Sequence, residues 1–430
     1  MNDWLHQKDS AYSWKVENEE KESLFSTYLI SFTSQNWRDE TEVKNVTWTH
    51  DLKIYVPEGV KAKKALFLIS GGVHGEDRTK ELCSCIPSWA QESSSVVCEI
   101  SLVPSQHIVF KDEIDARYEE VGRVEDQLVA FSWKKYLETQ DETWPLQMPM
   151  TKAVISAFDC IEEFSKNTLG FHIREFVVAG LSKRGWTAWL VAAHDLRVIG
   201  VIPMVIDLLN LRESFAHHFD VYGKWAPAIR DYAEIELDKW VYTDAFSRLL
   251  KLIEPFHYRE QLTMPKYIIN SASDDFFLPD SSQFYFQDLL EPKYLRYVPN
   301  CSHNLFESED AMSVAGAFYQ MVIENKPLPK FTWSQKHPHQ IEIECLDKPI
   351  EVNFWRALNK ENRDFRFNEV GSLWAKETVS LRQDGYYTFE LEIPKKGYCA
   401  YFIELKYLSM QKHPLIFTTD VYVMTQEKSS

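Results

Sequence analysis

The stretch Phe176–Trp186, FVVAGLSKRGW, contains an apolar run that stops at a serine, after which a helical pattern begins. This order predicts a buried strand, a sharp turn at Ser182 and a helix, with the serine hydroxyl held out of the sheet. Gly180 permits the tight turn because it has no Cβ. The common elbow, Gly-x-Ser-x-Gly, has its second glycine where this chain has Arg184, one residue before Gly185. On this stretch alone, Ser182 is either a nucleophile or the N-cap of the helix.

The length and composition are those of an ordinary water-soluble globular protein. With 430 residues, the chain is long enough for one large domain and a smaller one. Hydrophobic residues make up 45% and charged residues 26% of the chain. The formal net charge of −17 argues against nucleic acid or an anionic membrane as a partner, because both ligands require local positive potential.

The N-terminal residues lack the basic and apolar regions of a signal peptide, and no later apolar run approaches membrane-spanning length. We therefore expect a soluble protein without a membrane span, cytoplasmic as written and exported if a signal peptide was removed. The seven cysteines contain no C-x-x-C pair, so no metal site is expected. No pattern indicates a cofactor either.

Strand and helix patterns alternate through residues 46–329. Continuous apolar runs at Ala65–Ile69, Val96–Val103, Glu175–Gly180 and Val198–Ile206 are typical of strands covered on both faces, and helical spacing separates them. The pattern predicts an α/β domain with a mostly parallel sheet and helices on both faces. Residues 1–45 show no clear period and are expected to form an arm packed on this domain. Residues 208–258, rich in aromatics, are either a lid or a helical insertion with an aromatic core.

The pattern changes after Pro327-Leu328-Pro329. Between residues 330 and 430, short segments alternate with period two and are separated by turn residues such as Gln383-Asp384-Gly385. This part is predicted to be an all-β sandwich domain. It contains no catalytic constellation, and we expect it to stabilise the main domain or to contact a protein partner or a ligand.

A serine nucleophile needs a base, and the base needs an orienting carboxylate. Asp274 follows the predicted strand Lys266–Asn270, and His303 follows the predicted strand Tyr294–Val298. Strand ends of a parallel sheet meet at one edge, so Ser182, Asp274 and His303 are predicted to form a triad in the order Ser, acid, His. Asp275 is the second choice for the acid. Alternatively, the aspartate forms a turn and His303 is a surface residue before the last helix.

Asp207, at the end of the run Val198–Ile206, is a third candidate for the acid. The oxyanion is expected to bind the backbone N–H of Lys183 and that of Gly72 or Val73, in the glycine-rich turn after Ala65–Ile69. Lys183 and Arg184 either hold an acidic group of the substrate or pair with carboxylates of the protein.

These residues resemble a known family. The stretch GLSKRGWTAWL (residues 180–190), followed by IPMVID (202–207), DDFFLPDSS (274–282) and KYLRYVPNCSH (293–303), is similar to the PhoPQ-activated pathogenicity-related protein family. The resemblance covers nearly the whole chain. It implies an α/β-hydrolase fold in which the family's Ser, Asp and His fall on Ser182, Asp274 and His303. Many members of the family are exported, which leaves the compartment open.

The sequence thus predicts a serine hydrolase, an esterase or a peptidase, that acts on a small molecule or a peptide through an acyl-enzyme. The alternative is a non-catalytic binding or signalling protein on a hydrolase scaffold. Its recognition surfaces would be the aromatic insertion and the β-rich tail.

Overall fold

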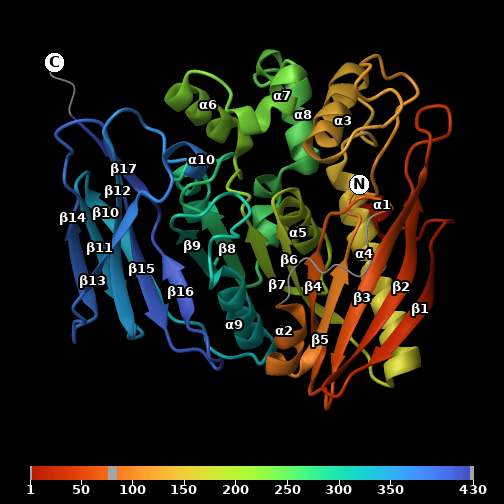
Figure 1. The fold of residues 1–430 in the computed structure, drawn as a ribbon, viewed down its shortest axis with the longest axis horizontal. Helices are drawn as coiled ribbons and strands as arrows, with labels where there is room; N and C mark the ends of the chain where they lie inside the picture. Colours follow the sequence, from red (N-terminus) through yellow and green to blue (C-terminus); the bar gives the residue numbers. More distant parts are fainter. Residues whose placement is uncertain (1, 76–84, 427–430) are drawn as a thin grey trace. The chain divides into compact units, whose positions relative to one another are not determined.

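The computed structural model describes residues 2–75 and 85–426, which fall into two compact units. The first unit consists of the described residues up to Pro203 together with Ile229–Met264. The second consists of Met204–Ala228 and the described residues from Pro265 onwards (Figure 1). The domain boundaries expected after residues 45 and 329 stay predictions.

The strands of the first unit form one sheet, in the order β1-β2-β3-β5-β4-β6-β7. Their bounds are β1 Ser13–Lys21, β2 Phe25–Asn36, β3 Thr47–Pro57, β4 Ala62–Ile69, β5 Ser95–Ile100, β6 Glu175–Leu181 and β7 Val198–Met204. β4 pairs in parallel with β5 and with β6, whereas β3 pairs antiparallel with β2 and β5. Residues Ala65–Ile69 of β4 are all buried, which explains their continuous apolar sequence.

The first 45 residues contribute two strands to this sheet. β1 pairs antiparallel with β2, and β2 pairs antiparallel with β3. Every second residue from Tyr28 to Ser34 is buried, an alternation that the sequence does contain. β1 forms the edge of the sheet; exposed and half-buried residues alternate in it only from Ser13 to Glu17, and the rest of the strand is exposed. The segment expected as an arm is thus built largely into the sheet.

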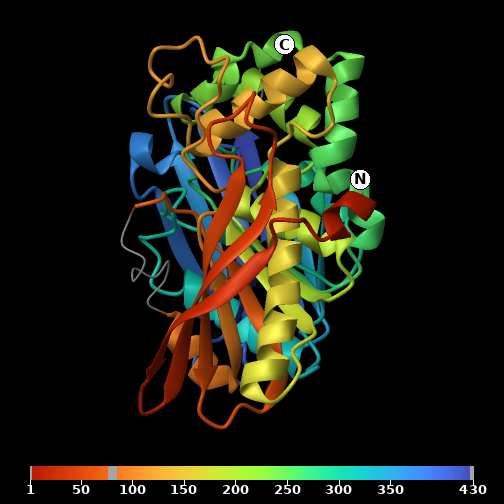
Figure 2. The ribbon, with the colours of Figure 1, turned by 90° about the vertical axis from the view of Figure 1, so that its right-hand side faces the viewer.

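Helices pack on the strands of the first unit. Their bounds are α1 Asn2–His6, α2 Ile86–Ser93, α3 Glu125–Thr139, α4 Gln147–Phe164, α5 Lys183–His194, α7 Arg230–Glu234 and α8 Asp244–Ile253. α2 contacts β3 and β5, α4 contacts β2 and α5, and α5 contacts β6 (Figure 2). Most residues of α4 are buried because neighbouring elements cover it on several sides.

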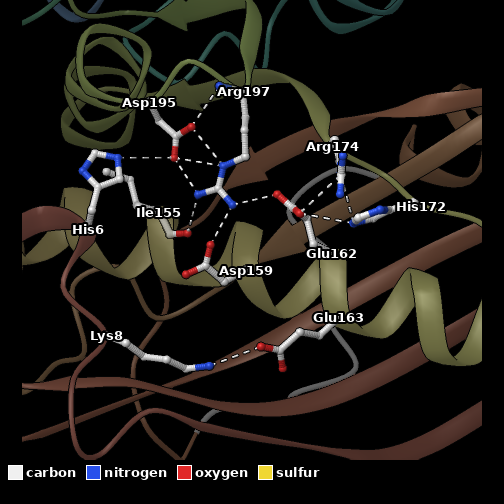
Figure 3. Close-up of polar contacts among 10 residues, drawn as sticks. All are labelled: His6, Lys8, Ile155, Asp159, Glu162, Glu163, His172, Arg174, Asp195 and Arg197. Atoms are coloured by element: carbon white, nitrogen blue, oxygen red, sulfur yellow. Dashed lines mark hydrogen bonds and ion pairs between the residues drawn. The ribbon is translucent and has the colours of Figure 1, made fainter.

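A cluster of ion pairs ties α4 to the turn that precedes β7 (Figure 3). Arg197 Nη1 lies 2.7 Å from Asp159 Oδ1 and 2.9 Å from Glu162 Oε1, while its Nη2 lies 2.6 Å from Asp195 Oδ2. The N-terminal segment joins α4 through Lys8 Nζ, 3.2 Å from Glu163 Oε1. These contacts tie α4 to the N-terminal segment and to the turn before β7, and the Phe158 ring of α4 stacks on that of Phe176 in β6 at 4.0 Å.

The second unit contains the parallel pair β8 and β9 and two C-terminal antiparallel sheets. The helices and strands of this unit are α6 Leu211–Tyr222, β8 Lys266–Ser271, β9 Lys293–Val298, α9 Ala311–Ile323, β10 Phe331–His337, β11 Gln340–Cys345, β12 Glu351–Asn359, α10 Phe367–Val370, β13 Trp374–Val379, β14 Tyr386–Glu390, β15 Tyr398–Tyr407, β16 Leu415–Thr418 and β17 Tyr422–Thr425. Short helical turns complete the described chain: η1 Ser165–Leu169, η2 Pro227–Ile229, η3 Leu237–Lys239, η4 Pro255–Gln261, η5 Ser281–Phe284 and η6 Phe286–Asp288.

The C-terminal strands form one sheet in the order β10-β11-β14 and another in the order β13-β12-β15-β16, with β17 on β15. Aromatic side chains join the two sheets. The ring of Phe354 on β12 lies 5.4 Å from that of Phe389 on β14, and Phe331 on β10 lies 5.9 Å from Phe417 on β16. The antiparallel C-terminal part that the period-two pattern predicts is therefore present.

The stretch 208–258 is helical, with α6, α7 and α8 joined by short 3-10 turns. Its residues up to Ala228 belong to the second unit and those from Ile229 to the first. The role of a lid stays a prediction. Among residues 2–75 and 85–426, no helix combines the length and the hydropathy of a membrane span.

Candidate active site

Ser182 occupies the junction between β6 and α5 with a strained backbone. Its φ of 55° and ψ of −127° lie outside the regions that residues with a side chain ordinarily adopt. The helix that follows begins at once, because Trp186 N–H donates to the Ser182 carbonyl at 2.9 Å. The Trp186 indole donates to the carbonyl of Ile253 at 2.6 Å and anchors that first helical turn. The strand, sharp turn and helix expected from the sequence are all present.

Gly180 explains how the turn is made without a glycine at position 184. A Cβ on Gly180 would lie 2.5 Å from the carbonyl oxygen of Arg184 and 3.0 Å from the nitrogen of Gly185. The first turn of α5 therefore approaches β6 so closely that only glycine fits at position 180.

The Arg184 side chain extends away from this contact and lies buried against Gly71. Its Nη2 is 2.5 Å from the position that a Cβ of Gly71 would occupy. Its Nε donates to the Val103 carbonyl at 2.7 Å, and its two terminal nitrogens contact Glu125 at 2.5 and 2.6 Å. This forked pairing is the geometry in which a guanidinium binds a carboxylate most strongly.

Lys183 pairs with the same carboxylate. Its Nζ lies 2.8 Å from Glu125 Oε2 and 3.1 Å from Asp126 Oδ2. Burial of Glu125 opposes its ionisation, but hydrogen bonds and charge from Arg184 and Lys183 outweigh this and hold its pKa well below the ordinary value. The positive charges of Lys183 and Arg184 are thus matched by carboxylates of the first turn of α3.

Gln106 connects this cluster to the glycine turn after β4. Its Nε2 donates to the Gly72 carbonyl at 3.0 Å and to Glu125 Oε1 at 2.6 Å, while its Oε1 accepts from the Glu125 N–H at 2.9 Å. Gly72 has a φ of 110°, which favours glycine. Gly72 and Val73, the candidates for the second oxyanion donor, therefore belong to a turn that is held on one side by Gln106.

Asp274 and His303 contact each other in the second unit, at the ends of β8 and β9. His303 Nδ1 lies 2.8 Å from Asp274 Oδ2 and 3.0 Å from Oδ1, and the two side chains are 12% and 2% exposed. The N–H groups of Phe276 and Phe277 donate to Asp274 Oδ1 at 2.7 and 3.3 Å. The Phe276 ring lies 4.3 Å from the imidazole ring. A hydrogen bond from Nδ1 to a carboxylate oxygen requires the proton on Nδ1, and this tautomer leaves Nε2 as the acceptor.

The other two candidate acids have hydrogen-bond partners other than the imidazole ring. Burial and the neighbouring Asp274 raise the pKa of Asp275, whose carboxylate accepts backbone hydrogen bonds from Asn368 and His303. Asp207 accepts hydrogen bonds of 2.6 Å from the hydroxyls of Tyr285 and Tyr297. Burial raises the pKa of Asp207 to about 8, against the lowering effect of these two bonds.

Sequence reasoning missed several residues that support these groups: Gln106, Glu125, Tyr285 and Tyr297, and also Asn300 and Trp374, which bond to each other, Trp374 also bonding to Ser273 directly before Asp274. Each bonds to a partner far along the chain, and no local motif marks such a pairing. Among the residues that the structure describes, no group of three or more His, Cys, Asp or Glu side chains has the arrangement of a metal site. Ser182 belongs to the first compact unit, whereas Asp274 and His303 belong to the second.

Comparisons with known proteins agree with this architecture. The profile of the family described as PhoPQ-activated pathogenicity-related protein matches residues 1–366. Autocrine proliferation repressor protein A of Dictyostelium discoideum is 31% identical over 99% of this chain and 90% of its own length.

Among solved structures, an acetyl xylan esterase from Paenibacillus sp. R4 aligns with a TM-score of 0.50 at 15% identity, over 76% of this chain and 92% of the esterase. Acetyl xylan esterase 1 from Thermoanaerobacterium sp. JW/SL YS485 aligns with a TM-score of 0.48 at 13% identity, over 73% of this chain and 88% of the esterase. At such low identity the likeness concerns the fold. The expected α/β-hydrolase fold with a C-terminal antiparallel β part is confirmed.

Proposed function

We propose that this chain, which belongs to the PhoPQ-activated pathogenicity-related protein family, is a serine hydrolase that cleaves an ester, or alternatively a peptide or amide. The observation that carries the proposal is the strained backbone of Ser182 between β6 and α5, because such strain persists chiefly where function requires it. The hydrogen-bonded pair of Asp274 and His303 supports it, since a serine needs an oriented base.

In the proposed reaction Ser182 Oγ attacks the carbonyl carbon of the substrate, and His303 Nε2 accepts the hydroxyl proton. Asp274 holds the Nδ1–H tautomer of His303 and stabilises the imidazolium that forms. The tetrahedral intermediate collapses to an acyl-enzyme as His303 returns the proton to the leaving group. Water, activated by His303, then releases the acid.

The oxyanion of the intermediate would accept hydrogen bonds from the backbone N–H of Lys183, directly after the nucleophile, and from that of Gly72 or Val73. The Lys183 N–H lies at the start of α5, where the helix dipole also favours negative charge. Loss of one such donor typically costs about 100- to 1,000-fold in kcat.

A fluorophosphonate probe tests the proposal because it reacts with activated serines. We expect the probe to label Ser182, and we expect Ser182→Ala to abolish both labelling and hydrolysis of a panel of short acyl esters, acetylated sugars and peptides. Asp274→Asn should lower kcat by about 10⁴-fold. Asp220→Asn, at an exposed position in the same compact unit, is the control and should change kcat far less. An unlabelled Ser182, with hydrolysis unchanged in Ser182→Ala, would show that the proposal is wrong.

The alternative is a non-catalytic binding or signalling protein. The relative that is 31% identical is named a proliferation repressor, a name that describes a biological effect and not a reaction. In that case Ser182→Ala would leave the biological effect of the protein intact, while changes in the C-terminal sheets would abolish it. Triad variants and tail variants assayed side by side therefore separate the two functions.

A further inference from the structure

The C-terminal β part sends one connection back to the loops that carry Asp274 and His303. This connection, residues 359–374, runs from the end of β12 to the start of β13 and contains α10 (Figure 1). It lies in the same compact unit as both loops. Its contacts fall into two groups, one through Trp374 and the other through the start of α10.

Trp374 bonds to both loops at once. Its indole Nε1 donates to Ser273 Oγ at 3.1 Å and to the Ala272 carbonyl at 3.3 Å, directly before Asp274. Its backbone N–H donates to Asn300 Oδ1 at 2.8 Å, and its carbonyl accepts from Asn300 Nδ2 at 2.9 Å, three residues before His303. The side-chain amide of Asn300 thereby pairs with the backbone of Trp374 through two hydrogen bonds, as the backbone of a neighbouring strand would.

Trp374 is itself held firmly within the β part. It is buried, and its ring lies 4.9 Å from that of Phe402 on β15 and 6.4 Å from that of Phe365. β13, which begins at Trp374, pairs antiparallel with β12. A residue that is held in a packed sheet can fix the position of the loops bonded to it more rigidly than another loop residue could.

The start of α10 makes the second group of contacts. The Phe367 N–H donates to the Ser273 carbonyl at 2.8 Å, and the Asn368 N–H donates to the Asp275 carboxylate. The residues on both sides of Asp274 are therefore bonded to the connection. Without these bonds, two separate loops would have to keep the acid and the base aligned by themselves.

We propose that residues 359–374 of the C-terminal β part position the acid–base pair, with Trp374 and Asn300 as positioning residues that set the alignment of Asp274 with His303. The inference rests on the proposed function, because it assigns these bonds a purpose in catalysis. It makes the β part a component of the hydrolase and not only a support or a recognition module. Misplacement of a catalytic group by about 1 Å can cost roughly 100-fold in rate, so bonds that fix two loops matter to kcat.

Two variants test this inference. Trp374→Phe removes the indole N–H and keeps an aromatic ring against Phe402. Asn300→Gly removes both bonds to Trp374 while it keeps the left-handed backbone that Asn300 adopts at a φ of 56°. Each variant should lower kcat for ester hydrolysis by about tenfold or more, with KM within about twofold, because the loss concerns alignment and not substrate binding.

Trp355→Phe is the matched control. The Trp355 ring also contacts Phe402, at 6.0 Å, but its buried indole N–H has no hydrogen-bond partner in the described structure. This control should leave kcat unchanged. If it lowers kcat as much as Trp374→Phe does, the effect is a general loss of packing and the inference is overturned.

A second readout does not depend on hydrolysis. The proton on His303 Nδ1, in its hydrogen bond to Asp274, gives a downfield resonance in the NMR spectrum of the full chain, observed with ¹⁵N-labelled histidine. We expect this resonance to shift or broaden in Trp374→Phe and in Asn300→Gly, and to stay unchanged in Trp355→Phe. Such a response without any hydrolysis by the natural chain would support the positioning while it refutes the proposed function. An unchanged resonance and unchanged kcat in both positioning variants would overturn the inference.

Discussion

At the scale of single residues, the turn between β6 and α5 depends on two positions with opposite requirements. Ser182 has a side chain in a backbone conformation that favours glycine, and Gly180 has no side chain because the backbone of α5 leaves no room for one. At position 182 the strained backbone is tolerated because a hydroxyl is needed there. At position 180 glycine is required by packing. The two residues should therefore respond to substitution in opposite directions.

Replacement of Ser182 by glycine should stabilise the protein. Ser182→Gly relieves the strain of the positive φ, and we expect the free energy of unfolding to rise by about 1 kcal/mol. Ser182→Ala keeps the strain and serves as the control, with a change within about 0.5 kcal/mol. Urea denaturation of both variants measures the difference. A glycine variant less stable than the alanine variant would contradict the strain argument.

Gly180→Ala should destabilise the protein by about 2 kcal/mol or more, because its methyl group would meet the rigid backbone of Arg184 and Gly185. Gly59→Ala is an informative control. Gly59 has a φ of 69° and nothing within 4 Å of an added Cβ, so it reports the cost of positive φ without a clash, about 1 kcal/mol. Equal costs for the two variants, measured by urea denaturation, would refute the close approach of α5 to β6.

At the scale of elements, Arg184 links the first turn of α5 to the first turn of α3. It also links α5 to Val103, in the segment that follows β5. Because the guanidinium makes a forked contact, Arg184→Lys is not a conservative change. We expect it to lower the free energy of unfolding by about 1–3 kcal/mol, since it breaks the forked hydrogen bonds of a buried guanidinium to a carboxylate that is 37% exposed. Arg117→Lys, in a pair with Asp115 whose arginine is 58% exposed, is the control and should cost less than about 0.5 kcal/mol. If denaturation experiments show that Arg184→Lys and Arg117→Lys lower the free energy of unfolding equally, the forked contact of Arg184 does not stabilise the fold as predicted.

The end of β7 contributes a pH dependence through Asp207. Its pKa is raised from 3.8 to about 8, so the stability that the neutral carboxyl supplies is fully present below pH 3.8 and is lost as the pH rises through 8. Asp207→Asn cannot ionise. Relative to the natural chain, its free energy of unfolding should rise between pH 5 and 8, by at most about 1.4 kcal/mol per pH unit.

Urea denaturation at a series of pH values measures this difference. The same change at the exposed Asp220, in the same unit, should leave the two pH profiles parallel. If the profile of Asp207→Asn were parallel to that of the natural chain as well, the carboxyl of Asp207 would not be neutral in the folded protein.

At the scale of the second compact unit as a whole, the C-terminal sheets complete the packing of β8 and β9. The Tyr267 hydroxyl on β8 donates to the Ile416 carbonyl, and the Tyr297 N–H on β9 donates to Thr418 Oγ at 3.0 Å. Ser282 Oγ donates to the buried Asp420 at 2.9 Å. The rings of Tyr267 and Tyr294 pack on Phe417 at 5.3 and 4.4 Å. These tyrosines need the C-terminal sheets in order to be buried.

Removal of residues 330–430 should therefore leave an aggregating protein and not a stable hydrolase domain. The truncation would expose Tyr267 and Tyr294, and would leave the Tyr297 N–H without its partner, a loss of about 1–3 kcal/mol for the hydrogen bond alone. Soluble yield and size-exclusion chromatography measure the outcome. A truncated chain that elutes as a monomer and melts cooperatively would contradict the prediction.

Features that depend on neighbours along the chain could be predicted from the amino-acid sequence. The apolar run before Ser182, its abrupt end and the helix after it are local signals, and the structure contains the strand, the turn and the helix. The same holds for the strands that precede Asp274 and His303. β2 was missed although its alternation is present, and β1 was missed because its alternation is confined to Ser13–Glu17 and the rest of this edge strand is polar and exposed.

Contacts between distant residues, by contrast, depend on how the folded chain packs and could not be predicted from local patterns. The Arg184–Glu125 pair spans 59 positions, the Gln106–Gly72 bond 34, and the Asn300–Trp374 bond 74. The sequence also left three aspartates open as the partner of His303, and only Asp274 contacts the ring. The physical reason is that hydropathy and turn chemistry act over a few residues. A buried charge or amide, by contrast, takes whichever partner the packing of remote elements brings to it.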